Sequence, residues 1–298
     1  MFTGIMQYTV AGFNIDVISE HPSYVFERFK EYKHTFSGES DFSIRVKQAK
    51  HIVLPENVVS IGQRVGRWLW IKREDGALSA YIKYSDFEEI AALVNWDKDF
   101  KNIELFVYDV EPFGGLPIAQ RIFYLLGDVF TYSCLSRGAG VFHSAAVCYK
   151  GEGILFSAPS GTGKSTHASL WKDVFGDDVV LFNDDTPVLK IENDEVFAYG
   201  TPWSGKTSIN RDIKVPLKAI VCLDRAENNS AKRLYGLDAF YRVFNEFRKP
   251  PEGGLLENCL TLIDGVLEKV PVFELLCNKD KDAVTTIYNA VGFGKNKL

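Results

Sequence analysis

Residues 153–166 read Gly-Ile-Leu-Phe-Ser-Ala-Pro-Ser-Gly-Thr-Gly-Lys-Ser-Thr, which is an apolar run, a glycine-rich bend and then the beginning of a helical sequence. A phosphate-binding P-loop has this order of strand, turn and helix N-terminus. The first N–H groups of such a helix have no partners within it, and the helix dipole favours an anion beside them. The stretch therefore predicts a polyphosphate site where the helix begins.

The residues of this loop have distinct predicted roles. Gly161 and Gly163 allow the backbone to curl so that successive N–H groups face the phosphates. Lys164 can reach the terminal phosphates, and the Ser165 hydroxyl can bind Mg²⁺. The predicted nucleotide-binding residues are Ser160, Gly161, Thr162, Gly163, Lys164, Ser165 and Thr166.

A second stretch competes for the same role. The strict pattern G-x-x-x-x-G-K-[ST] fails at 158–165, because Ala158 stands in place of the first glycine, whereas residues 200–207 satisfy it. After Lys164 the sequence is helical and free of proline until Pro187, but Val215-Pro216 soon follows the second stretch. A phosphate site needs the helix, so we assign the nucleotide to 158–166 and interpret 200–207 as a loop.

Composition limits the classes of function. The chain has 298 residues, a net charge of −5 and no block of Lys or Arg, which argues against a nucleic-acid partner. No apolar run is long enough to span a membrane, and the N-terminus lacks the pattern of a signal peptide. The five cysteines are scattered without a C-x-x-C pair, which indicates a reducing cytoplasm.

The pattern changes along the chain and predicts two domains. Residues 1–113 read as short strands with one helix near 87–95, typical of an antiparallel α+β module for recognition or assembly. The Pro- and Gly-rich segment 111–117 marks the boundary. Residues 114–298 alternate helices and strands around the P-loop and predict an α/β catalytic domain.

Two adjacent acids follow an apolar strand downstream of the P-loop. Asp184 and Asp185 come after Val-Val-Leu-Phe-Asn at 179–183, and ligands of open α/β sheets bind at such strand ends. Asp184 can hold Mg²⁺ together with Ser165, and Asp185 can take the proton of an attacking hydroxyl. Adjacent carboxylates repel unless a cation lies between them, which favours a metal site. The alternative is a solvated Asp-Asp turn.

Three further residues are candidates for the catalytic centre. His143 begins the strand that precedes the P-loop strand, although a histidine in an apolar strand is often structural. Lys206 and Arg211 lie in a polar loop at 200–212 that could bind the charge of a transferring phosphoryl group. A solvated surface loop explains the same composition.

His143, the loop 158–165 and Asn183-Asp184-Asp185 occur in the order and spacing of the HPr kinase/phosphorylase catalytic domain, which is related to the phosphoenolpyruvate carboxykinase P-loop fold. The resemblance covers about residues 118–291 and implies a P-loop kinase core of that type. It implies that Lys164 and Ser165 hold phosphates and Mg²⁺. It also implies that Asp185 is the base toward a serine hydroxyl, assisted by Asp184 at the metal and by His143.

These observations together predict an enzyme. We expect a cytoplasmic kinase that uses Mg²⁺ and ATP, or another nucleoside triphosphate, to phosphorylate a hydroxyl of a protein, peptide or small molecule. The N-terminal module would recognise the acceptor or build a homo-oligomer. The alternatives are a small-molecule enzyme like phosphoenolpyruvate carboxykinase and a nucleotide sensor without turnover.

Overall fold

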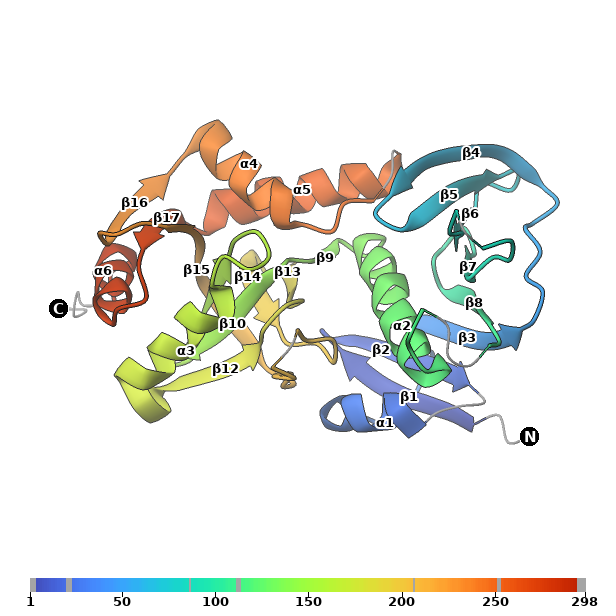
Figure 1. Cartoon of the computed structure of the whole chain (residues 1–298), viewed down its shortest axis with the longest axis horizontal. Helices are drawn as coiled ribbons and strands as arrows, with labels where there is room; N and C mark the ends of the chain where they lie inside the picture. The colour runs from blue at the N-terminus through green and yellow to red at the C-terminus, as the bar shows by residue number, and fades with distance from the viewer. Residues whose placement is uncertain are drawn as a thin grey trace. The chain divides into compact units, whose positions relative to one another are not determined.

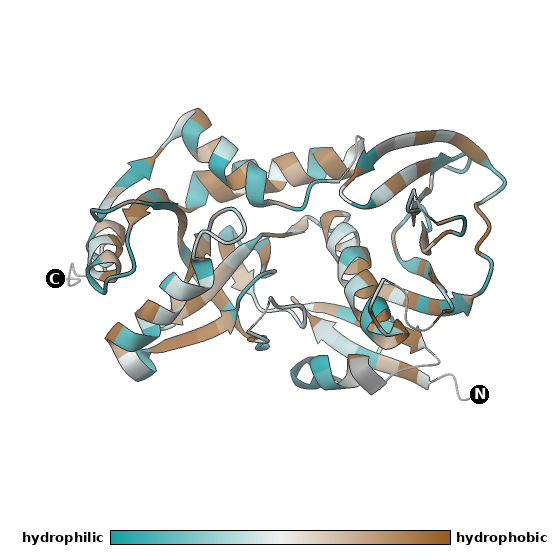
Figure 2. Ribbon diagram, viewed as in Figure 1, coloured by the Kyte–Doolittle hydropathy of each residue, from teal (hydrophilic) through white to brown (hydrophobic). Residues whose placement is uncertain are grey.

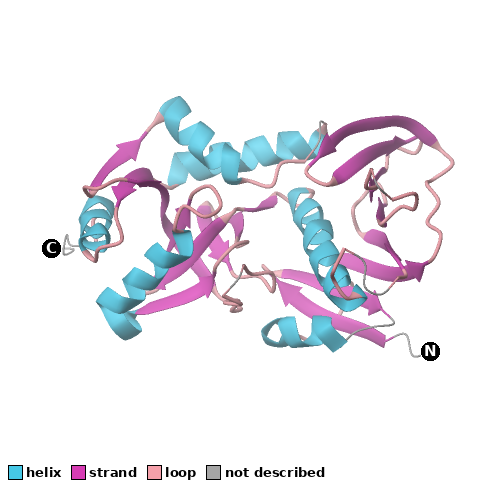
Figure 3. Cartoon of the chain, viewed as in Figure 1, coloured by secondary structure: helices cyan, strands magenta, loops and turns pink. Residues whose placement is uncertain are grey.

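The structure is a computed structural model that describes residues 4–19, 23–85, 87–110, 114–205, 207–250 and 253–293. The chain is a mixed α/β protein (Figure 3). It divides into two compact units, one formed by Met1–Arg137 with Lys249–Glu257 and the other by Gly138–Arg248 with Asn258–Leu298 (Figure 1).

The first unit is built on an eight-stranded sheet in the order β1-β2-β3-β8-β7-β6-β5-β4. The pairs β2–β3 and β3–β8 are parallel, and the other neighbours are antiparallel. Ala11 and Gly12 both have positive φ, which suits the tight hairpin between β1 and β2. The strands are β1 (Gly4–Val10), β2 (Phe13–Ser19), β3 (Phe42–Ala49), β4 (Val58–Val65), β5 (Trp68–Arg73), β6 (Leu78–Ile82), β7 (Ala92–Trp96) and β8 (Asn102–Tyr108), with short helices α1 (Ser23–Arg28) and η1 (Lys30–Tyr32).

The helix predicted near 87–95 is wrong, because Ala92–Trp96 forms strand β7. Both edges of this segment are paired, with β6 on one side and β8 on the other. Four of its five residues are buried. In a short buried apolar run between two strands, the backbone N–H and C=O groups form hydrogen bonds within the sheet. A helix of that length would leave more of these groups without partners.

Helix α2 (Ile118–Leu135) belongs to the first unit, so the units divide after Arg137 rather than at the predicted 113/114 boundary. Its buried Phe130 ring lies 6.4 Å from both Phe13 and Phe42 of the sheet. The Trp96 indole donates a hydrogen bond of 3.1 Å to Ser133 near the end of the helix. The apolar face of α2 therefore completes the core of the first sheet.

The second unit is built on a nine-stranded sheet. Its order is β12-β10-β11-β15-β14-β13-β9, with β17 also beside β15 and β16 beside β17. Strand β15 pairs in parallel with both β11 and β17. The elements are β9 (Ala139–Val141), β10 (Ser144–Tyr149), β11 (Glu152–Ser157), α3 (Lys164–Phe175), η2 (Gly176–Asp178), β12 (Val179–Asn183), β13 (Val188–Glu192), β14 (Glu195–Tyr199), β15 (Lys214–Arg225), β16 (Ser230–Leu234), α4 (Gly236–Glu246), α5 (Gly254–Lys269, of which residues 254–257 belong to the first unit), β17 (Val272–Cys277) and α6 (Asp282–Val291).

The core of the second unit fixes the position of α3. Trp171 on α3 is fully buried, and its ring lies 5.7 Å from Phe156 of β11 and 5.8 Å from Tyr149 of β10. Figure 1 shows α3 beside β10 and β12, and Figure 2 shows the apolar colouring of β12 beneath it. Because buried aromatic contacts hold α3 against the sheet, its first turn is fixed at the end of β11.

Candidate functional site

The glycine-rich bend 158–163 connects the end of β11 to the first residue of α3, so the predicted order of strand, bend and helix is present. Gly161 has a φ of +82° and Gly163 a φ of +130°. A Cβ at either position would meet no atom within 4 Å. The bend requires glycine there because of its backbone conformation and not because space is lacking.

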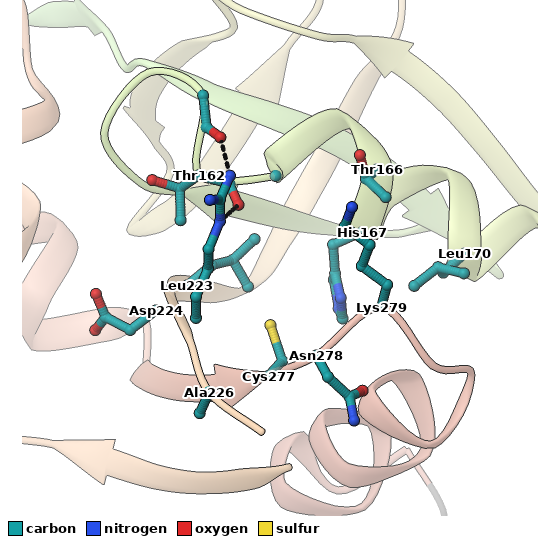
Figure 4. Close-up of a pocket in the computed structure, with 13 residues that line it drawn as sticks. Thr162, Thr166, His167, Leu170, Leu223, Asp224, Ala226, Cys277, Asn278 and Lys279 are labelled. Atoms are coloured by element: carbon teal, nitrogen blue, oxygen red, sulfur yellow. Dashed lines mark hydrogen bonds between the residues drawn. The ribbon is translucent and has the colours of Figure 1, made fainter. Parts of the chain in front are cut away.

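Arg225, at the end of β15, donates hydrogen bonds to two carbonyl oxygens of the bend. Its Nε donates a hydrogen bond of 3.0 Å to the Thr162 carbonyl oxygen, and its Nη2 donates to the Gly161 carbonyl oxygen (Figure 4). In a trans peptide the N–H points opposite to the C=O. The N–H of Gly163 therefore points away from Arg225.

Lys164 folds back over the bend. Its side chain is buried, and its Nζ donates a hydrogen bond of 2.7 Å to the Ala158 carbonyl oxygen. Ala158, which departs from the P-loop pattern, is not among the described residues with positive φ, so its backbone tolerates a side chain. Burial lowers the pKa of the Lys164 ammonium, while the carboxylates of Glu246 and Asp185 act in the opposite direction.

His143 lies between two carboxylates close to Lys164. Its Nε2 is 3.4 Å from Oδ1 of Asp185, and its Nδ1 is 2.8 Å from Oε2 of Glu246, the last residue of α4. The hydrogen bonds to Asp185 and then Glu246 raise the pKa of His143 against the effect of burial. An imidazole with both nitrogens facing carboxylates is favoured in its protonated form, which donates from both.

Asp185 is held in place by its backbone and by charge. Its N–H, and that of Thr186, donate to the Asn183 side-chain oxygen at 2.9 and 2.7 Å. Burial acts to raise the pKa of Asp185, but the hydrogen bond from His143 and the charges of His143, Arg248 and Lys164 outweigh it and lower the pKa. The carboxylate is therefore ionised at neutral pH.

Asp184 has hydrogen-bond partners of its own in the loop that follows β14, and its predicted pairing with Ser165 at Mg²⁺ stays a prediction. Its carboxylate accepts hydrogen bonds from the Gly205 N–H at 2.6 Å, the Thr207 N–H at 3.1 Å and the Thr207 hydroxyl. A Cβ on Gly205 would lie 3.1 Å from Asp184 Oδ2. Three of about four acceptor sites of this carboxylate are used, so Asp184 anchors Gly205 and Thr207 and keeps about one site for a further ligand.

The remaining predicted residues lie around this centre. Lys206 lies outside the described residues. Arg211 has an exposed side chain, while its N–H donates to the Phe182 carbonyl oxygen at 2.9 Å. Ser165 is half-buried in the first turn of α3, and Ser160 and Thr166 are exposed. Within the described part of the chain, no three His, Cys, Asp or Glu residues are grouped as a metal site.

Glu246, Arg225 and Arg248 are residues of this region that the sequence did not indicate. Glu246 is 103 residues from His143 along the chain, and it forms part of no motif. The only signal for it is indirect, since an amphipathic helix that ends in an acid can place that acid at the edge of a sheet. Arg225 is likewise the last residue of its element, strand β15.

No protein-family model and no curated protein matches the chain. Among solved structures, the chain is similar to the HPr(Ser) kinase/phosphatase from Coxiella burnetii. The match has 13% identity and a TM-score of 0.29, and it covers 50% of this chain and 95% of that protein. A likeness this weak does not establish the family. Within the described residues, every helix is too short or too polar to cross a membrane.

Proposed function

We propose that the second unit is a phosphotransferase that moves the terminal phosphoryl group of a nucleotide to a hydroxyl of a protein, peptide or small molecule. The observation that carries this proposal is the position of Asp185. It is fixed by His143 and lies close enough to Lys164 for the two charges to interact, at the bend where α3 begins.

The start of α3 supports a polyphosphate at the bend. Its N-cap, Gly163, supplies no side-chain cap to the first turn, so that turn keeps N–H groups available to an anion. The helix has 12 residues, long enough for its dipole to favour negative charge there. Lys164 would exchange its bond to the Ala158 carbonyl for a phosphate oxygen and compensate the charge that spreads over the transferring group.

Asp185 would orient and deprotonate the acceptor. The acceptor oxygen forms a bond to the terminal phosphorus as the bond to the bridging oxygen breaks, and the hydroxyl proton passes to the carboxylate. A carboxylate with a lowered pKa is a weak base, but phosphoryl transfer depends mainly on position and on charge compensation. Protonated His143, held by Glu246, keeps Asp185 ionised and fixed for that purpose.

The donor set near the bend fits Mg²⁺ bound through a nucleotide. Mg²⁺ is usually held by one or two carboxylates with substrate phosphates and waters, so a dedicated three-residue cluster is unnecessary. The Ser165 hydroxyl and the remaining acceptor position of Asp184 would hold it, which leaves Asp185 to the acceptor hydroxyl. The ion would neutralise charge on the phosphates. The first unit would recognise the acceptor or form a homo-oligomer.

Asp185→Asn tests this proposal, with Asp173→Asn on the exposed side of α3 as a matched control. Each protein is incubated with γ-labelled ATP and a lysate of the source cell, and ATP binding is measured separately. We expect Asp185→Asn to bind ATP and to lose transfer of label, while Asp173→Asn keeps both. Wild-type protein that binds ATP without labelling any acceptor would favour a sensor, and undiminished transfer by Asp185→Asn would refute the role of that residue.

A further inference from the structure

The segment that follows α4 runs beside the residues that lead into β10. Glu246 ends the helix, and Phe247 already has an extended backbone, with a φ of −71° and a ψ of 143°. The His143 N–H donates a hydrogen bond of 2.9 Å to the Glu246 carbonyl oxygen. Two residues further on, the Arg248 N–H donates a hydrogen bond of 3.2 Å to the Val141 carbonyl oxygen. These two bonds fix the backbone of Arg248 beside the acid centre.

The alternation of this extended segment sets the side on which the Arg248 side chain lies. Successive side chains of an extended chain point to opposite faces, and directly opposite residues of an antiparallel pair share a face. Phe142 and Phe247 form such a pair, and their buried rings lie 5.2 Å apart. His143 and Glu246 lie on the other face, where their side chains are 2.8 Å apart. Arg248, one residue beyond Phe247, shares the face of the His143–Glu246 pair.

The guanidinium group of Arg248 is exposed to solvent. Among the described residues it forms neither a hydrogen bond nor an ion pair, although Glu246 lies two residues earlier on the same face. Its charge acts on Asp185, and it lowers the pKa of that carboxyl together with the charge of Lys164. Arg248 thus reaches the acid centre from α4, whereas Lys164 reaches it from the bend.

The geometry of phosphoryl transfer gives these two sides different roles. The attacking and leaving oxygens lie roughly in line, so the acceptor and the rest of the donor are on opposite sides of the phosphorus. With the donor phosphates at the start of α3 beside Lys164, the acceptor would approach Asp185 from the side of Arg248. An anionic group on the acceptor would be repelled by Asp185 and by the phosphates unless a cation compensates its charge. Arg248 is such a cation.

We infer that Arg248 binds a carboxylate of the acceptor, and that the acceptor hydroxyl therefore has a carboxylate close to it. The inference rests on the proposed phosphotransferase function. A guanidinium group matches a carboxylate with two parallel hydrogen bonds. A carboxylate also brings one negative charge, which one guanidinium neutralises, whereas a phosphate would bring about −1.5 to −2 next to Asp185. An acidic residue beside a serine and a small hydroxy acid both present this chemistry.

Matched acceptors that differ by one charge test the inference. Wild-type protein is incubated with γ-labelled ATP and an equimolar set of short serine peptides with a neighbouring aspartate, the same peptides with asparagine, glycerate and the amide of glycerate. We expect label to enter acidic members about tenfold or more faster than their amide counterparts. Labelled aspartate peptides and labelled glycerate distinguish the two sources of the carboxylate. Equal labelling of acidic and amide members would overturn the inference.

A lysate of the source cell decides the case in which no synthetic member is labelled. The labelled acceptor is isolated and its phosphorylated hydroxyl is located by mass spectrometry. A carboxylate in an adjacent residue, or in the same small molecule, supports the inference, and its absence overturns the inference while the phosphotransferase proposal stands. Protein that labels nothing in either experiment would refute both.

Arg248→Gln and Arg248→Lys distinguish acceptor binding from contact with the transferring phosphoryl group. Because the side chain is exposed and has no partner among the described residues, both variants should fold. We expect Arg248→Gln to raise the KM for the acidic acceptor about tenfold or more and to leave ATP binding unchanged. Arg248→Lys keeps the charge and should restore part of the affinity.

Arg233→Gln, at another exposed arginine just before α4, is the matched control and should behave as wild type. A fall in kcat at an unchanged acceptor KM in Arg248→Gln would place this guanidinium at the transferring phosphoryl group. That result would overturn the inference and leave the phosphotransferase proposal standing.

Discussion

Glu246→Gln probes the acid–histidine–acid arrangement in the second unit. The change removes one negative charge and keeps the shape of the side chain. Glu246 is 14% exposed and His143 24% exposed, so their 2.8 Å contact is only partly screened by water. A hydrogen bond between charged groups contributes about 1.5–3 kcal/mol, and a tenfold change in proton affinity corresponds to about 1.4 kcal/mol. We expect the pKa of His143 to fall in the variant, because His143 loses one of the two carboxylates that raise it.

The same change should alter the dependence of stability on pH. The folded state raises the pKa of His143, so this group stabilises the protein fully below its unfolded pKa of about 6.5 and loses that effect as pH rises through the folded pKa. Glu246→Gln should therefore destabilise the protein by about 1–2 kcal/mol near pH 6 and by less near pH 9.

The assay is an NMR titration of the histidine ring signals, combined with chemical denaturation at several pH values. Glu195→Gln, an exposed acid where β14 begins, is the matched control and should change neither quantity. A pKa of His143 that stays the same or rises in Glu246→Gln would refute the reasoning. A loss of stability that is equal at all pH values would indicate altered packing in place of a lost charge pair.

Three further predictions concern the bend and its surroundings. Gly163→Ala should lower the free energy of unfolding by about 1–3 kcal/mol, because the φ of Gly163 is +130°. Gly254→Ala at the start of α5 should lower it by little. Equal effects of the two changes in thermal unfolding would contradict the backbone argument. Ala158→Gly restores the strict P-loop pattern and should change ATP affinity by less than about threefold, since Ala158 already has an ordinary φ. Asp184→Ala should speed amide hydrogen exchange at Gly205 and Thr207 by about tenfold or more, because both N–H groups lose their acceptor; unchanged exchange would exclude it as the anchor.

The sequence predicted the centre of the second unit because the signals there are local. Glycines that need positive φ, an apolar strand before them and helix-forming residues after them all lie within 153–166. The hairpin of β5 and β6 in the first unit is equally local. Such elements are specified by neighbouring residues, so they can be predicted without tertiary information.

The rest of the site depends on contacts between distant segments. Asp184 and Asp185 are adjacent in sequence, yet one faces a loop 21 residues later and the other faces His143. The direction of Asp184 is set by the N–H groups of Gly205 and Thr207 and that of Asp185 by the His143 ring, and spacing in the sequence predicts neither contact. Glu246 reaches His143 only because α4 ends there. The predicted 113/114 boundary placed α2 in the second domain, whereas the helix belongs to the first unit, because an apolar helix face does not show which sheet it will cover.

Strand β15 has a consequence for how the second unit folds. Ile220 and Val221 are paired on both sides, with β11 along one edge and β17 along the other, and Ala198 of β14 pairs with Val215 nearer the start of the strand. Strands β11 and β17 are far from β15 along the chain, so β15 can complete the sheet only after large loops have closed. The unit should consequently assemble slowly and melt in a single cooperative step, with the amide protons of β15 the last to be released.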